Sequence, residues 1–329
     1  MTQGTMVGMS FRTCALRLFL SLSLLPWGLA PGPAPAADKM LNDGNVLFIG
    51  DSHMTVGFGP TLDAILRNKI SSNVTSIGSC GTVPEDWNED DVKAAREQEV
   101  VHHRYPRAGR TTCGYWEQTK ASPISAPVFK HETPSLKKLM QDKEPALTVI
   151  AWGTNMLGSS QTALCKRLKK TMAQIPQNKP CFWIGPPHST RLPPGTVGNA
   201  DTVVKLTADR LKRVVESPAE TCGWTAETDP HPVCKFEDSQ DRPARAGRPA
   251  QACSGHPPYQ APEPGTNYCL RNGRRIGCPD GRHFYGNQAN RWASCIGTKI
   301  LADLPDLLAR TLQGSGASTL VRQSHSEEE

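Results

Sequence analysis

The sequence has little of what would place it in a specialised structural class. Aromatic residues make up 6% of its 329 positions, and 37 Lys and Arg are nearly balanced by 31 Asp and Glu. With 37% hydrophobic residues, this composition excludes collagen-like, coiled-coil and wholly disordered chains. The formal charge of +6 is weak for this length, and no zinc-knuckle or helix-turn-helix pattern occurs. We therefore expect no nucleic-acid partner.

The 11 cysteines also lack any C-x-x-C pair. The nearest Cys/His spacing, from His231 to Cys234, has no second half, so the sequence does not indicate a zinc site. We expect disulfides instead of a metal centre.

The first 36 residues have the pattern of an export signal. Two arginines precede an apolar run over 18–25, which is too short to span about 30 Å of hydrocarbon, and Ala34-Pro35-Ala36 resembles a cleavage site. We predict that 1–36 is a signal peptide, with an uncleaved membrane anchor as the alternative. Its removal takes away Cys14 and leaves an even number of cysteines, which suits pairing in an oxidising compartment. We expect a periplasmic or secreted protein with no membrane span after cleavage.

Short apolar runs alternate with amphipathic segments along the rest of the chain. The run at 45–49 is nearly continuous and ends at Gly50, as a buried parallel strand does. Segments with apolar residues on one helical face separate such runs. This alternation predicts a three-layer α/β/α domain with a mostly parallel sheet of about five strands, at 45–49, 74–77, 145–152, 181–184 and 233–236.

We expect a single folded domain over 37–313. Residues 80–132 show no hydrophobic period and 239–278 are rich in Pro, Gly and Cys, so both are predicted to be long loop insertions. A last helix over 285–304 is expected to close the domain, and 314–329 is expected to be a disordered tail.

Three polar motifs lie at predicted strand ends or just before the last helix. In parallel sheets, chemistry gathers at the carboxyl ends of the strands. Gly50-Asp51-Ser52-His53 follows the first strand, and we expect its serine to be exposed near the positive end of a helix dipole. Gly153-Thr154-Asn155 follows the third strand and could aim an amide into a cleft. Asp280-Gly-Arg-His283 could supply an imidazole and its orienting carboxylate, although each motif alone is also ordinary loop chemistry.

Together, and in the order Ser, Asn, Asp, His, these motifs resemble those of the SGNH, or GDSL-type, hydrolase superfamily. Gly50-Asp-Ser52 is similar to the first block of that family, Gly153-Thr-Asn155 to its third, and Asp280 with His283 to its fifth. For the glycine of the second block, Gly81 fits best by its distance from the strand, and Gly78 is the alternative. The resemblance covers about 45–304 and implies a flavodoxin-like fold. His53 departs from the leucine that usually follows the serine.

The resemblance implies a serine ester hydrolase that needs no metal or organic cofactor. Ser52 would attack an ester carbonyl, His283 would act as general base, and Asp280 would hold the imidazole tautomer. The backbone N–H groups of Ser52 and Gly81, together with the Asn155 amide, would form the oxyanion hole. We expect Asp51 to fix the turn by hydrogen bonding and to take no part in proton transfer.

Export and the resemblance together suggest an acylated carbohydrate of the cell envelope or extracellular space as substrate, with acetyl as the acyl group. An O-acetyltransferase with the same triad is the first alternative, and a lipase or thioesterase is the second. A catalytically silent glycan-binding protein is an alternative from another class, which the intact Ser, Asn, Asp and His argue against. The oligomeric state stays open.

The loops are expected to select the substrate. Three loop aromatics could stack on sugar rings, but we favour a place for them in the local core: Trp87, Tyr115 and Trp116. Four arginines near His283 are ordinary surface charge by default, and at the mouth of a site they would attract an anionic substrate: Arg271, Arg274, Arg275 and Arg282.

Two disulfides can be suggested from the sequence. Cys80 could pair with Cys113 and tie down the loop that carries Gly81. If Gly273-Arg274 is a two-residue hairpin turn, Cys269 and Cys278 lie opposite each other at a distance that suits a disulfide. A turn at Asn272-Gly273 would shift the register and separate this pair.

Overall fold

A computed structural model describes residues 39–42, 44–55, 57–102, 114–119, 131–189, 192, 195–225, 231–232, 234–239, 253, 269–271, 274–276 and 286–324. At 98–102, 269–271, 274–276 and 312–324 only the backbone is described. The predicted signal peptide over 1–36 lies outside these residues. No helix in the described part of the chain is both long and apolar enough to cross a membrane.

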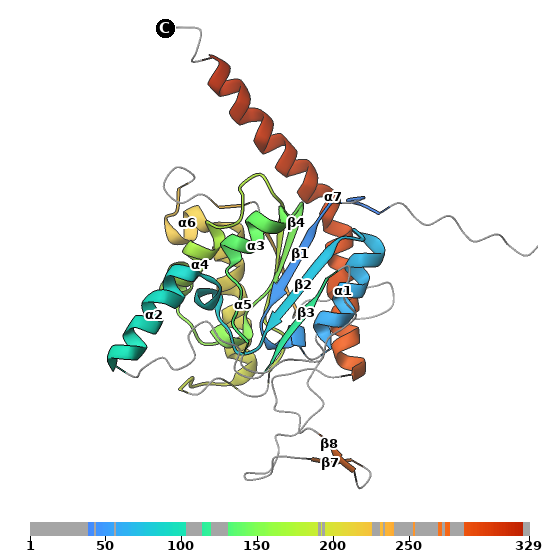
Figure 1. Ribbon diagram of the computed structural model, residues 1–329, viewed down its shortest axis with the longest axis vertical. Helices are drawn as coiled ribbons and strands as arrows, with labels where there is room; N and C mark the ends of the chain where they lie inside the picture. Colours follow the sequence, from blue (N-terminus) through green and yellow to red (C-terminus); the bar gives the residue numbers. More distant parts are fainter. Residues whose placement is uncertain are drawn as a thin grey trace, which may run out of the picture. The chain divides into compact units, whose positions relative to one another are not determined.

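The centre of the fold is a six-stranded sheet in the order β3-β2-β1-β4-β5-β6 (Figure 1). Only β2 and β3 pair antiparallel, and the other neighbours are parallel. The strands are β1 (Val46–Gly50), β2 (Val74–Ser79), β3 (Tyr115–Gln118), β4 (Leu147–Ala151), β5 (Cys181–Ile184) and β6 (Cys234–Glu237). This confirms the predicted fold class, and all five predicted strands are present, joined by β3.

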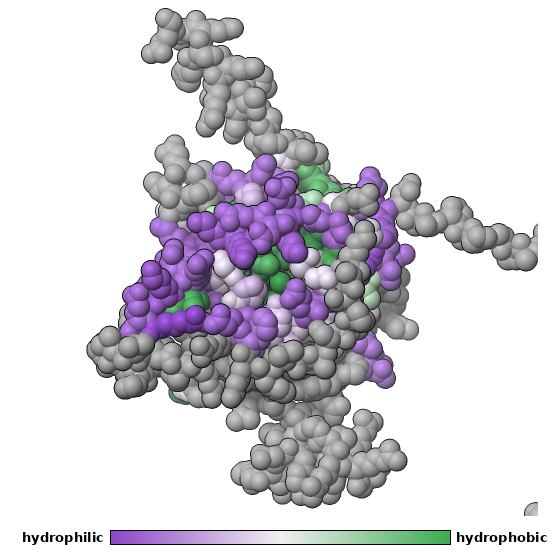
Figure 2. Space-filling model, in the orientation of Figure 1, coloured by the Kyte–Doolittle hydropathy of each residue, from purple (hydrophilic) through white to green (hydrophobic). Residues whose placement is uncertain are grey.

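Helices cover both faces of the sheet (Figure 1). One face packs against α1 (Phe58–Lys69) and α7 (Gly286–Ser324), and the other packs against α3 (Leu136–Lys143), α4 (Gln161–Met172) and α5 (Ala200–Glu216). The short α6 (Pro218–Cys222) follows α5. Side chains of β1 alternate between the two layers: Phe48 packs with α1 and α7, while Ile49 packs with the other layer. The outer face shown in Figure 2 is mostly hydrophilic, as expected when apolar sides meet inside.

Strand order makes the end of β1 a topological switch point of the sheet. This strand pairs with β2 on one side and with β4 on the other. The chain leaves β1 for α1 on one face of the sheet, and it leaves β4 for α4 on the opposite face. Loops that diverge in this way leave room for a ligand beyond the carboxyl ends of the two strands. The predicted motifs at Ser52 and Asn155 follow these two strands.

The segment over 80–132, predicted to be a long loop, contains regular structure. It includes the 3-10 turn η2 (Pro84–Trp87), α2 (Glu89–His102) and the edge strand β3. Highly charged α2 shows no clear apolar stripe, and four residues of β3 are too few for a periodic signal. In β3, Tyr115 packs into one core layer and Trp116 into the other, so the strand is held by its two aromatic side chains.

Helix α7 also extends beyond its predicted end at 304. It runs through Pro305 to Ser324, and so enters the segment over 314–329 that we expected to be disordered. Proline inside a helix removes one backbone hydrogen bond, which is why the sequence suggested a stop. Leu304 and Leu307 on either side of Pro305 are fully buried, and their burial favours continuing the helix across the proline.

A separate hairpin consists of β7 (Cys269–Arg271) and β8 (Arg274–Ile276). Its register pairs Cys269 with Ile276 and Arg271 with Arg274. This is the register of an Asn272-Gly273 turn, so the condition for placing Cys269 opposite Cys278 is not met. The register therefore matches the alternative turn. Both dipeptides contain glycine, so the sequence alone did not decide between them. Cys278 itself lies outside the described residues.

Disulfides link several helices and strands of the main domain. Three have both partners described: Cys165–Cys222, Cys181–Cys234 and Cys253–Cys295. Cys80 is disulfide-bonded as well, and Cys113, its suggested partner, lies outside the described residues. Disulfides of this number are consistent with a protein that folds in an oxidising compartment.

Candidate active site

Ser52 begins η1 (Ser52–Thr55), a 3-10 turn directly after β1. Asp51 Oδ1 accepts the backbone N–H of His53 at 3.1 Å, and Thr55 Oγ1 donates to the Ser52 carbonyl at 2.8 Å. Asp51 therefore fixes the turn, as predicted. The expectation of an exposed serine is wrong, since only 3% of Ser52 is exposed.

Two glycines allow η1 to lie tightly against the sheet. A Cβ at Gly50 would lie 2.6 Å from Met54 Cγ and 2.7 Å from the Ala151 carbonyl oxygen. A Cβ at Gly78, its partner on β2, would lie 2.4 Å from Met54 Cβ. Because such contacts are too short for any side chain, both positions require glycine. Gly78 thus has a packing role inside β2.

Gly81 lies beyond the end of β2. It is exposed and has φ of +79°, a left-handed conformation that favours glycine. Its N–H makes no hydrogen bond within the described part of the chain. An accessible, unengaged N–H is what an oxyanion donor needs. These features support Gly81 over Gly78 as the glycine of the second motif.

Asn155 lies in η3 (Thr154–Met156), the turn that follows β4. Its Nδ2 donates to the Thr82 carbonyl oxygen at 3.0 Å, which joins the loop after β4 to the loop after β2. Thr82 directly follows Gly81 in the chain. The bond therefore places the Asn155 side chain against the residue next to Gly81, the other predicted oxyanion donor. An amide nitrogen carries two hydrogens, and the second remains for a ligand.

A buried hydrogen bond joins the loop of Ser52 to the loop of Asn155. His53 Nε2 and Thr154 Oγ1 lie 2.9 Å apart, and both residues are buried. Each is the direct neighbour of a predicted site residue. The structure therefore brings together the motifs that contain Ser52, Gly81 and Asn155, which follow three adjacent strands.

The start of α7 lies beside the Ser52 turn. A Cβ at Gly57 would lie 3.2 Å from Ala289 Cβ, and Thr61 Oγ1 donates to Asn290 Oδ1 at 2.8 Å. The Trp292 ring meets the His53 ring edge-on, with centroids 5.1 Å apart. The remaining two predicted site residues, Asp280 and His283, precede α7 and lie outside the described residues.

The three loop aromatics belong to the core. Trp87, Tyr115 and Trp116 expose 1%, 6% and 1% of their surfaces, so none forms an open platform for a sugar ring. Burial raises the pKa of Tyr115, whose hydroxyl donates to Glu117. The side chains of the four arginines near His283 are not described: the first three at 271, 274 and 275 are described by backbone alone, and the fourth at 282 is not described.

The structure shows one imidazole–carboxylate pair that the sequence analysis missed. His188, in the segment after β5, lies 3.1 Å from Asp201 in the first turn of α5, measured between Nε2 and Oδ1. Twelve residues separate the two in the chain, so no short-range spacing signals the pair. It is a His–Asp combination in the segments that follow β5 and begin α5.

Glu237 ends β6 at the same edge. Burial raises the pKa of its carboxyl to about 8, and the nearby Asp303 adds to the shift through its charge and a hydrogen bond. Its Oε1 is buried without a hydrogen-bond partner in the described part of the chain. Glu237 is therefore a carboxyl group whose protonated form the fold prefers.

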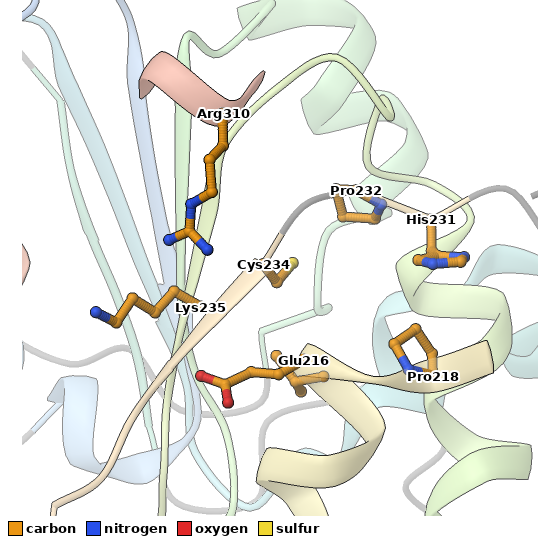
Figure 3. A pocket seen from close by; sticks show the side chains of 8 residues that line it. Glu216, Pro218, His231, Pro232, Cys234, Lys235 and Arg310 are labelled. Atoms are coloured by element: carbon orange, nitrogen blue, oxygen red, sulfur yellow. The ribbon is translucent and has the colours of Figure 1, made fainter. Parts of the chain in front are cut away.

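The described cavities differ greatly in size and position. A space of about 10 Å³, comparable to one water molecule, lies between η1, the β4 turn and Trp292, and its lining includes Asp51, His53 and Thr154. A pocket of about 400 Å³ lies at the opposite edge, where β6 begins. There Arg310 extends from α7 and Glu216 from the end of α5 (Figure 3). The larger pocket contains none of the predicted site residues.

No group of three or more His, Cys, Asp or Glu that could hold a metal ion occurs among the described residues.

No protein-family model and no curated protein matches the chain. One solved structure with a similar fold is the C-terminal catalytic domain of Streptococcus pneumoniae peptidoglycan O-acetyltransferase A, with a methylsulfonyl adduct. Its sequence is 11% identical and its TM-score is 0.38, and the match covers 80% of this chain and 96% of that chain. Est24, a carbohydrate acetylesterase from Sinorhizobium meliloti, has 11% identity and a TM-score of 0.36 and covers 78% and 99%. A carbohydrate acetylesterase family member from the same organism has 13% identity and a TM-score of 0.32 and covers 80% and 99%. These likenesses concern the fold alone.

Proposed function

We propose that the chain is an exported serine esterase that removes small acyl groups, above all O-acetyl, from carbohydrate through an acyl-enzyme on Ser52. The observation that carries this proposal is the pair of bonds that joins the loops after β1, β2 and β4. These are the bond from Asn155 to the Thr82 carbonyl and the bond between His53 and Thr154. They assemble a candidate nucleophile and two candidate oxyanion donors at one edge of the sheet.

Each group has a definite role in the proposed reaction. The Ser52 hydroxyl attacks the ester carbonyl carbon while His283 takes its proton, and Asp280 orients the imidazole. The N–H groups of Ser52 and Gly81 and the Asn155 amide stabilise the negative oxygen of the tetrahedral intermediate. His283 then protonates the departing sugar hydroxyl, leaving the acyl group on Ser52. Water, activated by the same imidazole, releases the acid and restores the serine.

Chain connectivity supports the role of His283. Residue 283 precedes Gly286, the first residue of α7, by three positions, so its Cα lies within about 11 Å of the start of that helix. The first turn of α7 lies beside Gly57, two residues after Thr55, where the turn of the candidate nucleophile ends. The loop that carries Asp280 and His283 therefore has the reach to meet Ser52.

The proposed export and substrate are supported by features outside the candidate site. The signal-like residues 1–36 and the observed disulfides suit an oxidising compartment. Acetylated carbohydrates are among the esters of the envelope and its surroundings.

Ester hydrolysis by the mature chain and by Ser52→Ala tests the proposal. We expect the wild type to release acetate from chromogenic acetyl esters and O-acetylated glycans, and Ser52→Ala to lose about 10³-fold or more in kcat. Ser294→Ala, at an exposed position in α7, is the matched control and should keep full activity. Equal turnover by wild type and Ser52→Ala would remove Ser52 as nucleophile. Activity on long-chain esters alone would favour a lipase, and acetyl transfer to an added sugar would favour a transferase.

A further inference from the structure

The buried histidine beside the candidate nucleophile has a more specific function than filling space. Resting on the proposed function, we propose that the hydrogen bond between His53 and Thr154 is a positioning device that holds the Asn155 amide at the oxyanion position relative to Ser52. The two side chains act through their neighbours in the sequence and touch no reacting atom. They are positioning residues for the acyl-transfer step.

This hydrogen bond joins the two turns that carry the candidate site residues, η1 and η3. His53 follows Ser52 in η1, and Thr154 precedes Asn155 in η3. Nε2 and Oγ1 lie 2.9 Å apart although the residues are 101 positions apart in the chain. Because each turn is short, a displacement of His53 also displaces Ser52, and a displacement of Thr154 also displaces Asn155. The bond therefore sets the separation of the candidate nucleophile and the amide.

The imidazole has little freedom to turn away from Thr154. His53 is 2% exposed, and the Trp292 ring lies perpendicular to it at 5.1 Å between centroids. A space of about 10 Å³ beside the ring has room for about one water molecule. Close packing in the core therefore disfavours rotation of the imidazole away from Thr154.

A second bond completes the frame around Asn155. Its Nδ2 donates to the Thr82 carbonyl at 3.0 Å, next to Gly81. The η3 turn is thus held from two directions, by η1 through Thr154 and by the β2 loop through Asn155. Placement matters for catalysis because a displacement of about 1 Å in a catalytic group can cost about 10²-fold in rate.

Thr154→Val tests the proposal because valine keeps the branched shape and lacks the hydroxyl. We expect kcat on an acetyl ester to fall about 10- to 100-fold while KM stays within about twofold, since the oxyanion forms only in the transition state. Thr154→Ser, which restores a hydroxyl, should recover most of kcat. Thr311→Val is the matched control: its buried hydroxyl bonds the Leu307 carbonyl in α7, far along the helix from Trp292.

A double-mutant cycle adds a readout that a merely structural role would not produce. His53→Leu and Thr154→Val should each lower kcat, and the double variant should be no slower than the slower single variant, because both remove the same bond. Multiplying losses would overturn the proposal. Circular dichroism and thermal unfolding midpoints show whether each variant is folded. If His53→Leu does not fold, the Thr154→Val and Thr154→Ser variants test the proposal without the cycle.

The outcomes separate this inference from the proposed function. Full kcat in folded Thr154→Val beside an inactive Ser52→Ala would overturn the positioning role and leave the esterase intact. A lower melting temperature with unchanged kcat would also overturn it. No activity in the wild type towards any ester would overturn the proposed function, and the positioning role with it.

Discussion

Trp292 in α7 donates its indole N–H to the hydroxyl of Ser239, 3.1 Å away. That hydroxyl donates in turn to the Gly185 carbonyl at 2.8 Å, so the bond reaches the loops after β6 and β5. The same indole stacks on Phe58 of α1 with ring centroids 3.7 Å apart and meets His53 edge-on. Through these contacts one side chain connects α7 to α1, to η1 and to the loops after β5 and β6.

Loss of this hydrogen bond should destabilise the protein. Trp292→Phe keeps an aromatic ring in the core but removes the buried donor, so we expect the free energy of unfolding to fall by about 1–3 kcal/mol. Urea denaturation followed by circular dichroism measures the change. Trp224→Phe is the control, because Trp224 is also buried but has no described hydrogen bond from its indole. Equal losses in both variants would mean that ring volume alone matters.

The central strands could be predicted from sequence because both of their faces are buried. Phe48 and Ile49 of β1 enter opposite core layers, and such burial requires a nearly continuous apolar run. Edge strand β3 lacked this signal because it is short and charged residues surround it. The continuation of α7 through Pro305 was also missed, since tertiary burial of Leu307 outweighed a local helix-breaking signal.

Removal of the Asn155 side chain should affect catalysis more than folding. Asn155→Ala removes one oxyanion donor, and we expect kcat to fall about 10²- to 10³-fold. The bond to Thr82 is also lost, which should cost about 1 kcal/mol in stability. Asn45→Ala is a matched control because Asn45 Nδ2 likewise donates to a backbone carbonyl, that of Lys143, just before β1. A comparable loss of kcat in both variants would contradict a specific role for Asn155.

The candidate site was predictable only where a residue directly follows a strand. Ser52 and Asn155 follow β1 and β4, so sheet topology places them together once the strands are known. The bond between His53 and Thr154 and the pair of His188 with Asp201 depend on loop conformations that local sequence does not encode. The burial of Ser52 likewise depends on packing from distant parts of the chain.

The disulfide between Cys165 and Cys222 should contribute to stability. It links α4 to α6 and closes a loop with a sequence separation of 57 residues. Replacing both cysteines by alanine should lower the free energy of unfolding by about 2–4 kcal/mol, mainly because the unfolded chain gains freedom. Denaturation under non-reducing conditions measures the loss, and mass spectrometry verifies the remaining disulfides. An unchanged midpoint would show that this link does not constrain the unfolded state.

Glu237 should make the protein less stable as pH rises. Its pKa is raised from 4.5 to about 8 in the fold, chiefly because burial disfavours the charged form. The folded state therefore holds a proton that the unfolded state releases at lower pH. This contribution to stability is complete below about pH 4.5, decreases between about pH 4.5 and 8, and is absent above that range.

Glu237→Gln isolates this effect, because glutamine resembles the protonated carboxyl and does not titrate. We expect the free energy of unfolding of the variant to exceed that of the wild type at pH 8 and to match it near pH 5. The difference should grow across that interval by at most about 1.4 kcal/mol per pH unit. Glu220→Gln, at an exposed position in α6, controls for the change of residue type and should follow the wild type. A difference between wild type and Glu237→Gln that does not depend on pH would show that Glu237 is ionised in both states, against the carboxyl proton inferred from its burial beside Asp303.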